Sequence, residues 1–251
     1  MTEDIFSQES YRCRLDWGFI GTERAILRGD IIVIVDTLSF STTTTYAVSR
    51  GALIFPCTTS DDAKEVALRV GGVPAVQRSE VPRFGRYSLS PFTFYSVSEG
   101  EKVVLPSLNG SACSSNHAAT NQVFAGALVN ATAVSSAVTE CLADGSGAVT
   151  IIACGEREKV PQPAGDLRVA IEDWLGAGAI IARLNVSKSP EARLCEIGFV
   201  SSARYVADLA WDCISGRELR AAGYGEDVKF AAELDTIDTV PTLRNGAFIK
   251  L

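Results

Sequence analysis

The sequence predicts an α/β protein with three layers, in which helices cover both faces of a mostly parallel sheet and an antiparallel element adds a C-terminal edge. Apolar β-branched runs such as IIVIV (residues 31–35) are typical of strands that are buried on both faces. These runs alternate with helical segments, which is the pattern of a parallel sheet. The tail VPTLRNGAFIKL (residues 240–251) places Asn-Gly between two short apolar runs and predicts an antiparallel hairpin.

Local periodicity predicts the individual elements. We expect strands at residues 31–35, 52–55, 73–76, 102–106, 122–128 and 148–154. We expect helices at about residues 43–52, 60–72, 111–120, 131–143, 166–184 and 201–214. Helical character continues to residue 235, with interruptions predicted at SGRE and AGYGED. Ser60 and Gly71 are the residue types that begin and end a helix, and they bound the segment at 60–72.

The chain has no internal repeat and no evident boundary, so we expect residues 1–251 to form a single domain. The one long stretch without a regular pattern is residues 77–100, rich in Ser, Pro, Arg and aromatic residues. A loop of this length in a compact domain is more often functional than a linker. GAGA at 176–179 lies inside a predicted helix and indicates close helix packing, since no GxGxxG motif occurs.

Composition and charge exclude several classes of protein. The chain has 251 residues, of which 47% are hydrophobic and 21% charged, as in ordinary globular proteins. No apolar run approaches the ~18 residues of a membrane span, and the N-terminus MTEDIFSQES is not a secretory signal. Seven scattered cysteines indicate reduced thiols, so we expect a cytoplasmic protein. A net charge of −7 argues against nucleic-acid binding, and a homo-oligomer is left open.

The single histidine, His117, excludes any metal centre built from several imidazoles. A Ser-His-Asp triad would have to use His117, which lies among small residues, where a surface or capping histidine is the commoner case. With thirty carboxylates and so few nitrogen ligands, a metal ion here is expected to be hard and oxygen-bound. Mg²⁺ is therefore the leading candidate.

Polar side chains follow several predicted strands, where ligands bind in open α/β sheets. Asp36 follows IIVIV, Asn109 follows the strand at 102–106, Asn130 follows the one at 122–128, and Gly155-Glu156-Arg157 follow TIIAC. Hydroxyl-rich helix starts come after two of these ends, at Ser41-Thr42-Thr43 and at Ser111. Helix N-termini suit phosphate or sulfate. The alternative is that these hydroxyls only cap the helices.

Other phosphate chemistries are excluded, because the chain lacks a GxxxxGK[ST] loop, a cysteine-phosphatase loop and an Asp-x-Asp nucleophile. The acidic pair Glu172-Asp173 interrupts an apolar helix, and adjacent helix positions point about 100° apart. At least one of the two therefore approaches the buried face, where a carboxylate is costly unless it is paired or metal-bound. The alternative, which the pair taken alone favours, is that both face solvent. In the long loop, Arg78, Arg83 and Arg86 could clamp an anionic substrate.

Several segments, in order, resemble the motifs of one family. VDTLSFSTT, YSLSP, LPSLNGSA and GALVNATAVSSAV, then ACGER and AIEDWLGAGAI, are similar to the blocks VDVLRATTT, LGNSP, TTNGTRA, GSLLNAxAVAxAL, CAG and EDxxxAGAI. These blocks, with a C-terminal stretch ending in Val-Pro, belong to the 2-phosphosulfolactate phosphatase family, Mg²⁺-dependent enzymes of the coenzyme M pathway. The resemblance covers nearly the whole chain.

The resemblance implies a three-layer α/β/α fold, Mg²⁺, and hydrolysis of a phosphate ester on a small sulfonated or carboxylated acid. The predicted catalytic residues are Asp36, Asn109, Glu172 and Asp173, and the predicted metal ligands are Asp36, Glu172 and Asp173. The predicted substrate-binding residues are Ser39, Ser41, Thr42, Ser90, Gly110, Ser111, Asn130 and Arg157. Attack by water or directly by Asp36 are both open.

Two departures from the family pattern bear on the substrate. Ser39 and Ala112 stand where the family has arginines that would pair with substrate anions. We therefore expect weak activity on 2-phosphosulfolactate, partly restored by Ser39→Arg or Ala112→Arg, unless Arg157 or the loop arginines compensate. Two alternatives differ in class: a non-catalytic binder of anionic metabolites on a degenerate scaffold, and an enzyme acting on a non-phosphate substrate.

Overall fold

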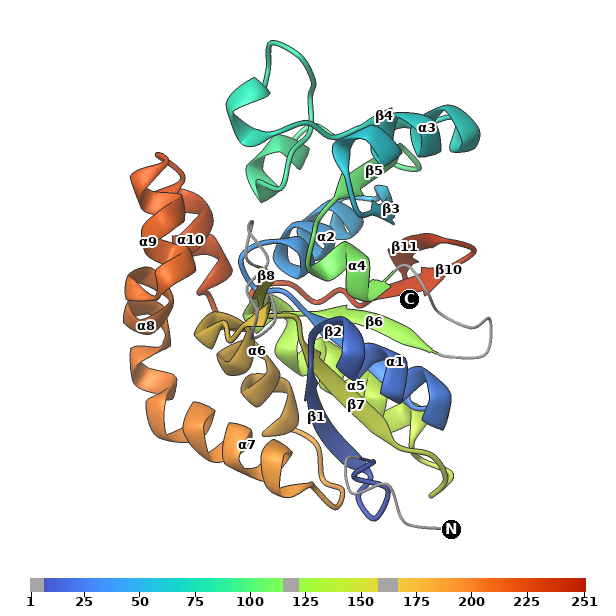
Figure 1. The fold of residues 1–251 in the computed structure, drawn as a ribbon, viewed down its shortest axis with the longest axis vertical. Coiled ribbons are helices and arrows are strands. Elements are labelled where there is room, and N and C mark those ends of the chain that lie inside the picture. Colours follow the sequence, from blue (N-terminus) through green and yellow to red (C-terminus); the bar gives the residue numbers. More distant parts are fainter. Residues whose placement is uncertain (1–6, 115–121, 158–166) are drawn as a thin grey trace.

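The computed structural model describes residues 7–114, 122–157 and 167–251. Its centre is a nine-stranded sheet with the order β1-β7-β2-β6-β10-β11-β3-β5-β4, and a two-stranded sheet pairs β8 with β9 (Figure 1). The strands of the large sheet are β1 (Cys13–Trp17), β2 (Ile31–Val35), β3 (Leu53–Cys57), β4 (Val73–Pro74), β5 (Lys102–Pro106), β6 (Val123–Gly126), β7 (Val149–Ala153), β10 (Pro241–Arg244) and β11 (Ala247–Lys250). The small sheet contains β8 (Glu156–Arg157) and β9 (Leu167–Arg168).

Helices cover both faces of the sheet. They are α1 (Gly18–Arg28), α2 (Phe40–Ser49), α3 (Ser60–Val70), α4 (Gly110–Ser114), α5 (Ala131–Cys141), α6 (Ile171–Ile181), α7 (Pro190–Ser202), α8 (Val206–Asp212), α9 (Ile214–Ala221) and α10 (Gly225–Ala231). The alternation along β2 shows the layers directly. Val33 and Val35 belong to a core with residues of α5, α6 and α7, whereas Ile32 and Ile34 belong to a core with residues of α1 and α2. The predicted three-layer fold is confirmed.

The large sheet consists of two parallel groups, β1-β7-β2-β6 and β3-β5-β4, joined by the hairpin β10–β11. Asn245 and Gly246 form its turn with φ of 53° and 81°, the left-handed conformation that this tight turn requires. The predicted antiparallel C-terminal element is confirmed, although the hairpin lies between β6 and β3 in the strand order. Because three antiparallel pairings separate the groups, β3, β5 and β4 run opposite to β2, β6 and β7.

Each strand predicted from the sequence is present, and the loop at 77–100 contains only two short 3-10 turns, Arg78–Glu80 and Pro91–Phe94. Several details of the prediction were wrong. SGRE lies within α9 rather than interrupting it, Thr59 rather than Ser60 caps α3, and Leu167–Arg168, expected at the start of a helix, form β9. Thr59 takes this role because its side chain accepts from the Asp62 N–H. In the described parts of the chain, no helix is long and apolar enough to cross a membrane.

Candidate active site

The ends of three parallel strands bring their following residues together. Val35 is in register with Gly126 of β6 and with Ala153 of β7, so Asp36 emerges beside the residues that follow both neighbours. Asn109 comes from β5 in the other parallel group, and the loop after β5 still reaches the same point. The Gly110 N–H donates to Asp36 Oδ2 at 2.9 Å. Asp36 and the Asn109-Gly110 segment therefore lie together at this end of the sheet.

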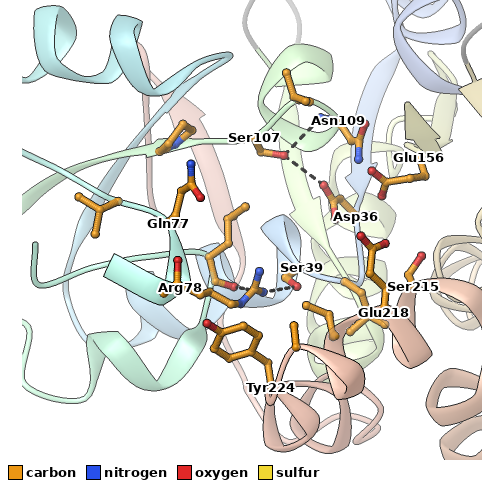
Figure 2. A pocket seen from close by; sticks show the side chains of 18 of the residues that line it. Asp36, Ser39, Gln77, Arg78, Ser107, Asn109, Glu156, Ser215, Glu218 and Tyr224 are labelled. Atoms are coloured by element: carbon orange, nitrogen blue, oxygen red, sulfur yellow. Dashed lines mark hydrogen bonds between the residues drawn. The ribbon is translucent and has the colours of Figure 1, made fainter. Parts of the chain in front are cut away.

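A cavity of about 750 Å³ opens at this point, and residues from seven separate segments line it. Its polar lining consists of Asp36, Ser39, Thr58, Thr59, Gln77, Arg78, Ser79, Ser107, Asn109, Glu156, Ser215, Glu218 and Tyr224. Figure 2 shows the carboxylates of Asp36, Glu156 and Glu218 on one side, and Arg78 with Tyr224 on the other. The cavity thus has an acidic wall, formed by these three carboxylates, and a basic pole.

Asp36 occupies the start of two helices. Its carboxylate accepts from the N–H of Phe40 at 3.1 Å in α2 and of Gly110 at 2.9 Å in α4, and Ser107 Oγ lies 3.4 Å away. Burial raises the pKa of Asp36, and these donors only partly oppose the shift. The predicted anion site at the two helix starts is consequently filled, at these two N–H groups, by the chain's own carboxylate.

Glu156 is a site residue that the predicted set omitted, although it follows β7 just as Asp36 follows β2. Burial, followed by repulsion from Asp36, raises the pKa of Glu156 to about 7. A hydrogen bond with the Asn109 side chain opposes this shift. A carboxyl with this pKa beside a second carboxylate is a candidate for proton transfer near neutral pH.

Ser215, in α9, contributes a hydroxyl that has no hydrogen-bond partner among the described residues. The residue is 5% exposed and lines the cavity on the side of Glu218. A buried polar atom is costly to leave unsatisfied, so this hydroxyl, which lies just beneath the cavity surface, would gain from a polar partner on that side. No motif in the sequence marks Ser215, because the residue reaches the cavity only through the packing of α9.

Arg78 enters the cavity from the long loop. Its guanidinium donates to Asp227 Oδ2 at 3.0 Å, to Ser39 Oγ at 2.7 Å and to the Leu89 carbonyl at 2.6 Å. Ser39 and Arg78 both line the cavity, as predicted for Ser39 and as considered for the loop arginines. Ser90, another predicted residue, donates to the same Asp227 at 2.7 Å and thus supports Arg78 from behind.

Asp173 and Glu172 are both buried, although the sequence required burial of only one of them, and neither lines the cavity. Asp173 accepts from the N–H of Thr37 at 2.7 Å and of Gly155 at 2.9 Å, so it ties together the loops after β2 and β7. Burial, with repulsion from Asp36 and Glu172, raises its pKa well above the ordinary value. Among the described residues, no three His, Cys, Asp or Glu side chains lie close enough to hold a metal ion by themselves.

Most of the other predicted substrate-binding residues shape the loops around the cavity. The side chains of Ser41, Thr42, Ser111 and Asn130 all donate to backbone carbonyls, of Ile34, Thr37, Leu105 and both Ala125 and Thr239 respectively. Arg157 is exposed and lines a second hollow together with Ala112, away from the acidic wall. Its N–H donates to Asn109 Oδ1 at 3.2 Å. His117 lies outside the described residues.

An α/β sheet with a polar cavity at its strand ends is the kind of site in which enzymes of this fold class bind small molecules. Comparison with known families narrows this class. The family model described as 2-phosphosulpholactate phosphatase matches residues 21–246. The chain belongs to the 2-phosphosulfolactate phosphatase family, whose named members are phosphoric monoester hydrolases. The predicted family membership is confirmed.

The individual relatives are distant but align along most of their length. The 2-phosphosulfolactate phosphatase of Methanocaldococcus jannaschii is 29% identical over 222 residues, covering 84% of this chain and 88% of the relative. The enzyme of the same name from Methanothermobacter thermautotrophicus is 26% identical, with 86% and 88% covered. A probable 2-phosphosulfolactate phosphatase from Carboxydothermus hydrogenoformans is 26% identical, with 84% of each chain covered.

Proposed function

We propose that this protein is a Mg²⁺-dependent phosphatase that hydrolyses a phosphate ester of a small acid, 2-phosphosulfolactate or a related phosphorylated acid. The observation that carries the proposal is the cavity in which Asp36 and Arg78 face a common space at the strand ends. Family membership supports the reaction type. The unpartnered hydroxyl of Ser215 supports the view that this cavity holds a polar ligand.

The residues present are compatible with Mg²⁺. This ion usually takes one or two carboxylates and completes its octahedron with waters and substrate phosphate, so three protein ligands are not required. Asp36 lines the cavity and is paired with no described cation, and Glu156 and Glu218 share its wall. Bound there, Mg²⁺ would screen the charge that develops on the phosphoryl oxygens. Glu172 and Asp173 were also predicted as metal ligands. Neither lines the cavity, and their role as ligands stays a prediction.

The chain's own side chains would have separate tasks. Two N–H donors orient Asp36, so its carboxylate would either position a water molecule against the phosphorus or attack it directly. Ser215 would donate to a phosphoryl oxygen, since its hydroxyl has no other described partner. The Asn109 side chain, which is hydrogen-bonded to Glu156, would keep the environment of the leaving group polar. The configuration at phosphorus, followed with a chirally labelled ester, distinguishes the two routes through Asp36. One direct displacement by water inverts the configuration, whereas two displacements through an aspartyl phosphate retain it.

The test is a panel of phosphate esters assayed with metal-free protein, with and without added Mg²⁺. We expect phosphate release from 2-phosphosulfolactate or 2-phospholactate that depends on Mg²⁺. Binding of these esters without turnover would instead favour the non-catalytic binder. No binding and no turnover on any phosphate ester would favour an enzyme of a different substrate class on this scaffold.

A further inference from the structure

The loop between β4 and β5 delivers Arg78 to the cavity through a short, well-held turn. Arg78 begins the 3-10 turn Arg78–Glu80, and the Glu80 carboxylate accepts from the Gln77 N–H at 2.9 Å. This bond closes the turn and fixes where the Arg78 side chain starts. The side chain is only 16% exposed, so it lies within the cavity wall rather than in open solvent.

The guanidinium is held in one orientation before any ligand arrives. Asp227, itself 5% exposed, accepts from its Nε, and Ser39 and the Leu89 carbonyl both accept from its Nη2. The Tyr224 ring lies 5.5 Å from the guanidinium carbon and supports its face. Nη1 donates to no described residue, so its two hydrogens are available to a ligand. An arginine constrained in this way loses little conformational entropy when it binds an anion.

Charge is divided between the two sides of the cavity. Arg78 is the only cation among the described residues that line it, whereas Asp36, Glu156 and Glu218 are acidic. Ser39, which touches Arg78, lies three residues after Asp36. An extended chain gains at most ~3.6 Å per residue, so the backbone of Ser39 lies within roughly 11 Å of that of Asp36. Because Arg78 and the acidic wall line the same cavity, we expect one small molecule with two anionic groups to contact both sides of it.

We propose that Arg78 binds the second anionic group of the substrate, a carboxylate or sulfonate, and so makes the enzyme selective for phosphorylated acids over simple phosphate monoesters. This inference rests on the proposed function, in which the phosphoryl group lies toward Asp36 and Ser215. With Mg²⁺ held at the acidic wall, the phosphoryl group would be drawn to that side of the cavity. Arg78, the only cation among the described residues that line the cavity, is then left for the carboxylate or sulfonate. Asp227, Ser90 and Tyr224 act as positioning residues for Arg78. Their arrangement gives the guanidinium a fixed direction that a solvated arginine lacks.

The test compares two substrates that differ only in the acid group: 2-phospholactate and isopropyl phosphate. With Arg78→Met, we expect kcat/KM for 2-phospholactate to fall about 30- to 100-fold, which corresponds to the loss of one charge-assisted hydrogen bond from Nη1. For isopropyl phosphate we expect a change of less than about threefold, because this ester has nothing to present to Arg78. Arg83→Met is the matched control, since Arg83 belongs to the same loop, stacks on Phe84 and does not line the cavity.

Equal losses on both substrates would overturn the proposal, because Arg78 would then bind the phosphoryl group or support the fold. No loss on 2-phospholactate would overturn it as well. Because Arg78→Met leaves Asp227 buried without its partner, the double variant Arg78→Met/Asp227→Asn provides a second test without that charge. The same selective loss in the double variant supports the assignment, and an unselective one rejects it.

Failure of the proposed function is recognised separately. If the wild type hydrolyses neither ester, the phosphatase proposal fails, and Arg78 is tested by calorimetric binding of sulfolactate. Wild-type binding at least tenfold tighter than that of Arg78→Met supports recognition of the acid group. Equal affinity, or no binding to either protein, overturns it.

Discussion

Asp36 both supports the fold and belongs to the candidate active site. It caps α2 and α4 through the Phe40 and Gly110 N–H groups, and it lines the cavity. In Asp36→Asn one acceptor oxygen becomes a donor, which costs about 1–2 kcal/mol when a backbone N–H loses its partner. Removing a buried charge whose pKa burial raises offsets this cost. The side chain therefore contributes more to the site than to the net stability of the fold.

We accordingly expect Asp36→Asn to lower kcat on a verified substrate by about a thousandfold or more while the free energy of unfolding changes by about 1 kcal/mol or less. Steady-state kinetics and urea unfolding measure the two effects. Glu226→Gln is the control, because Glu226 is largely exposed and pairs only with Lys229. A variant with near-wild-type kcat would remove Asp36 from the chemistry.

Ser39 and Ala112, the two positions that depart from the family pattern, lie in different hollows of the molecule. Ser39 Oγ lies 2.7 Å from the Arg78 guanidinium, so an arginine at 39 would meet a like charge in a partly buried site. Ala112 lines the second hollow instead. We now expect Ser39→Arg to lower kcat/KM on 2-phosphosulfolactate by about tenfold, and Ala112→Arg to change it by less than threefold. Recovery of activity in Ser39→Arg would show that the cavity accommodates a second arginine.

At the scale of elements, α6 is the helix on which the site's loops depend. Gly176 allows it to approach the loop after β2, where an added Cβ would lie 2.7 Å from Thr37 Oγ1. Gly178 allows α7 to approach, where an added Cβ would lie 2.7 Å from the Cys195 carbonyl and 2.6 Å from the Phe199 Cβ. The close helix packing inferred from GAGA is thus observed, and it places Asp173 where it can hold two loops.

Gly178→Ala should therefore destabilise the protein by about 1–3 kcal/mol, because the methyl group overpacks the α6–α7 contact and outweighs the better helix propensity of alanine. Gly225→Ala is the control, since an added Cβ there meets only side-chain atoms at ordinary or nearly ordinary distances, the end of Trp211 at 3.3 Å and Arg220 Cγ at 3.6 Å. Urea unfolding of both variants measures the difference. Equal stability of the two would show that α7 shifts without cost.

Elements with a strong local pattern could be predicted, and those defined by their neighbours could not. IIVIV and the Asn-Gly turn are local signals, and both were predicted correctly. The sequence analysis missed α7, although Ser189 caps it and Pro190 begins it, because its apolar residues show no clear face. It also missed β1 and α1, where Gly18 with φ of +57° turns the chain directly from strand to helix.

The whole molecule explains why the site was only partly predictable. Asp36, Ser39 and Asn109 follow strands and could be found by that rule. Arg78 and Ser215 come from an irregular loop and from α9, and only tertiary packing brings them to the cavity (Figure 2). Asp173 and Glu172 could be recognised as buried acids, but not as residues behind the wall, because direction on a helix depends on what packs around it.

The acidic wall should also determine how stability depends on pH. The groups acting on Glu156 are Asp36 and Glu218, which raise its pKa, and Arg168 and the Asn109 side chain, which lower it. Burial has the largest effect, and the net result of all these influences is that the pKa of Glu156 rises from 4.5 to about 7. A carboxyl with a raised pKa in the folded state binds its proton more tightly when folded. The free energy of unfolding therefore falls as pH rises from about 4.5 to about 7.

For Glu156 alone we expect a loss of about 2 kcal/mol between pH 4.5 and pH 8, after allowance for screening at a partly exposed group. Glu156→Gln should remove that part, because glutamine does not titrate, while Asp36 and Asp173 continue to contribute in both proteins. Urea unfolding of wild type and variant at several pH values, in buffer with EDTA, gives the difference directly. Parallel pH profiles for the two proteins would mean that Glu156 titrates at its ordinary pKa. If Glu156 titrates as expected, added Mg²⁺ should stabilise the wild type more at pH 8 than at pH 5, because a cation binds the ionised acidic wall and competes with protons for it.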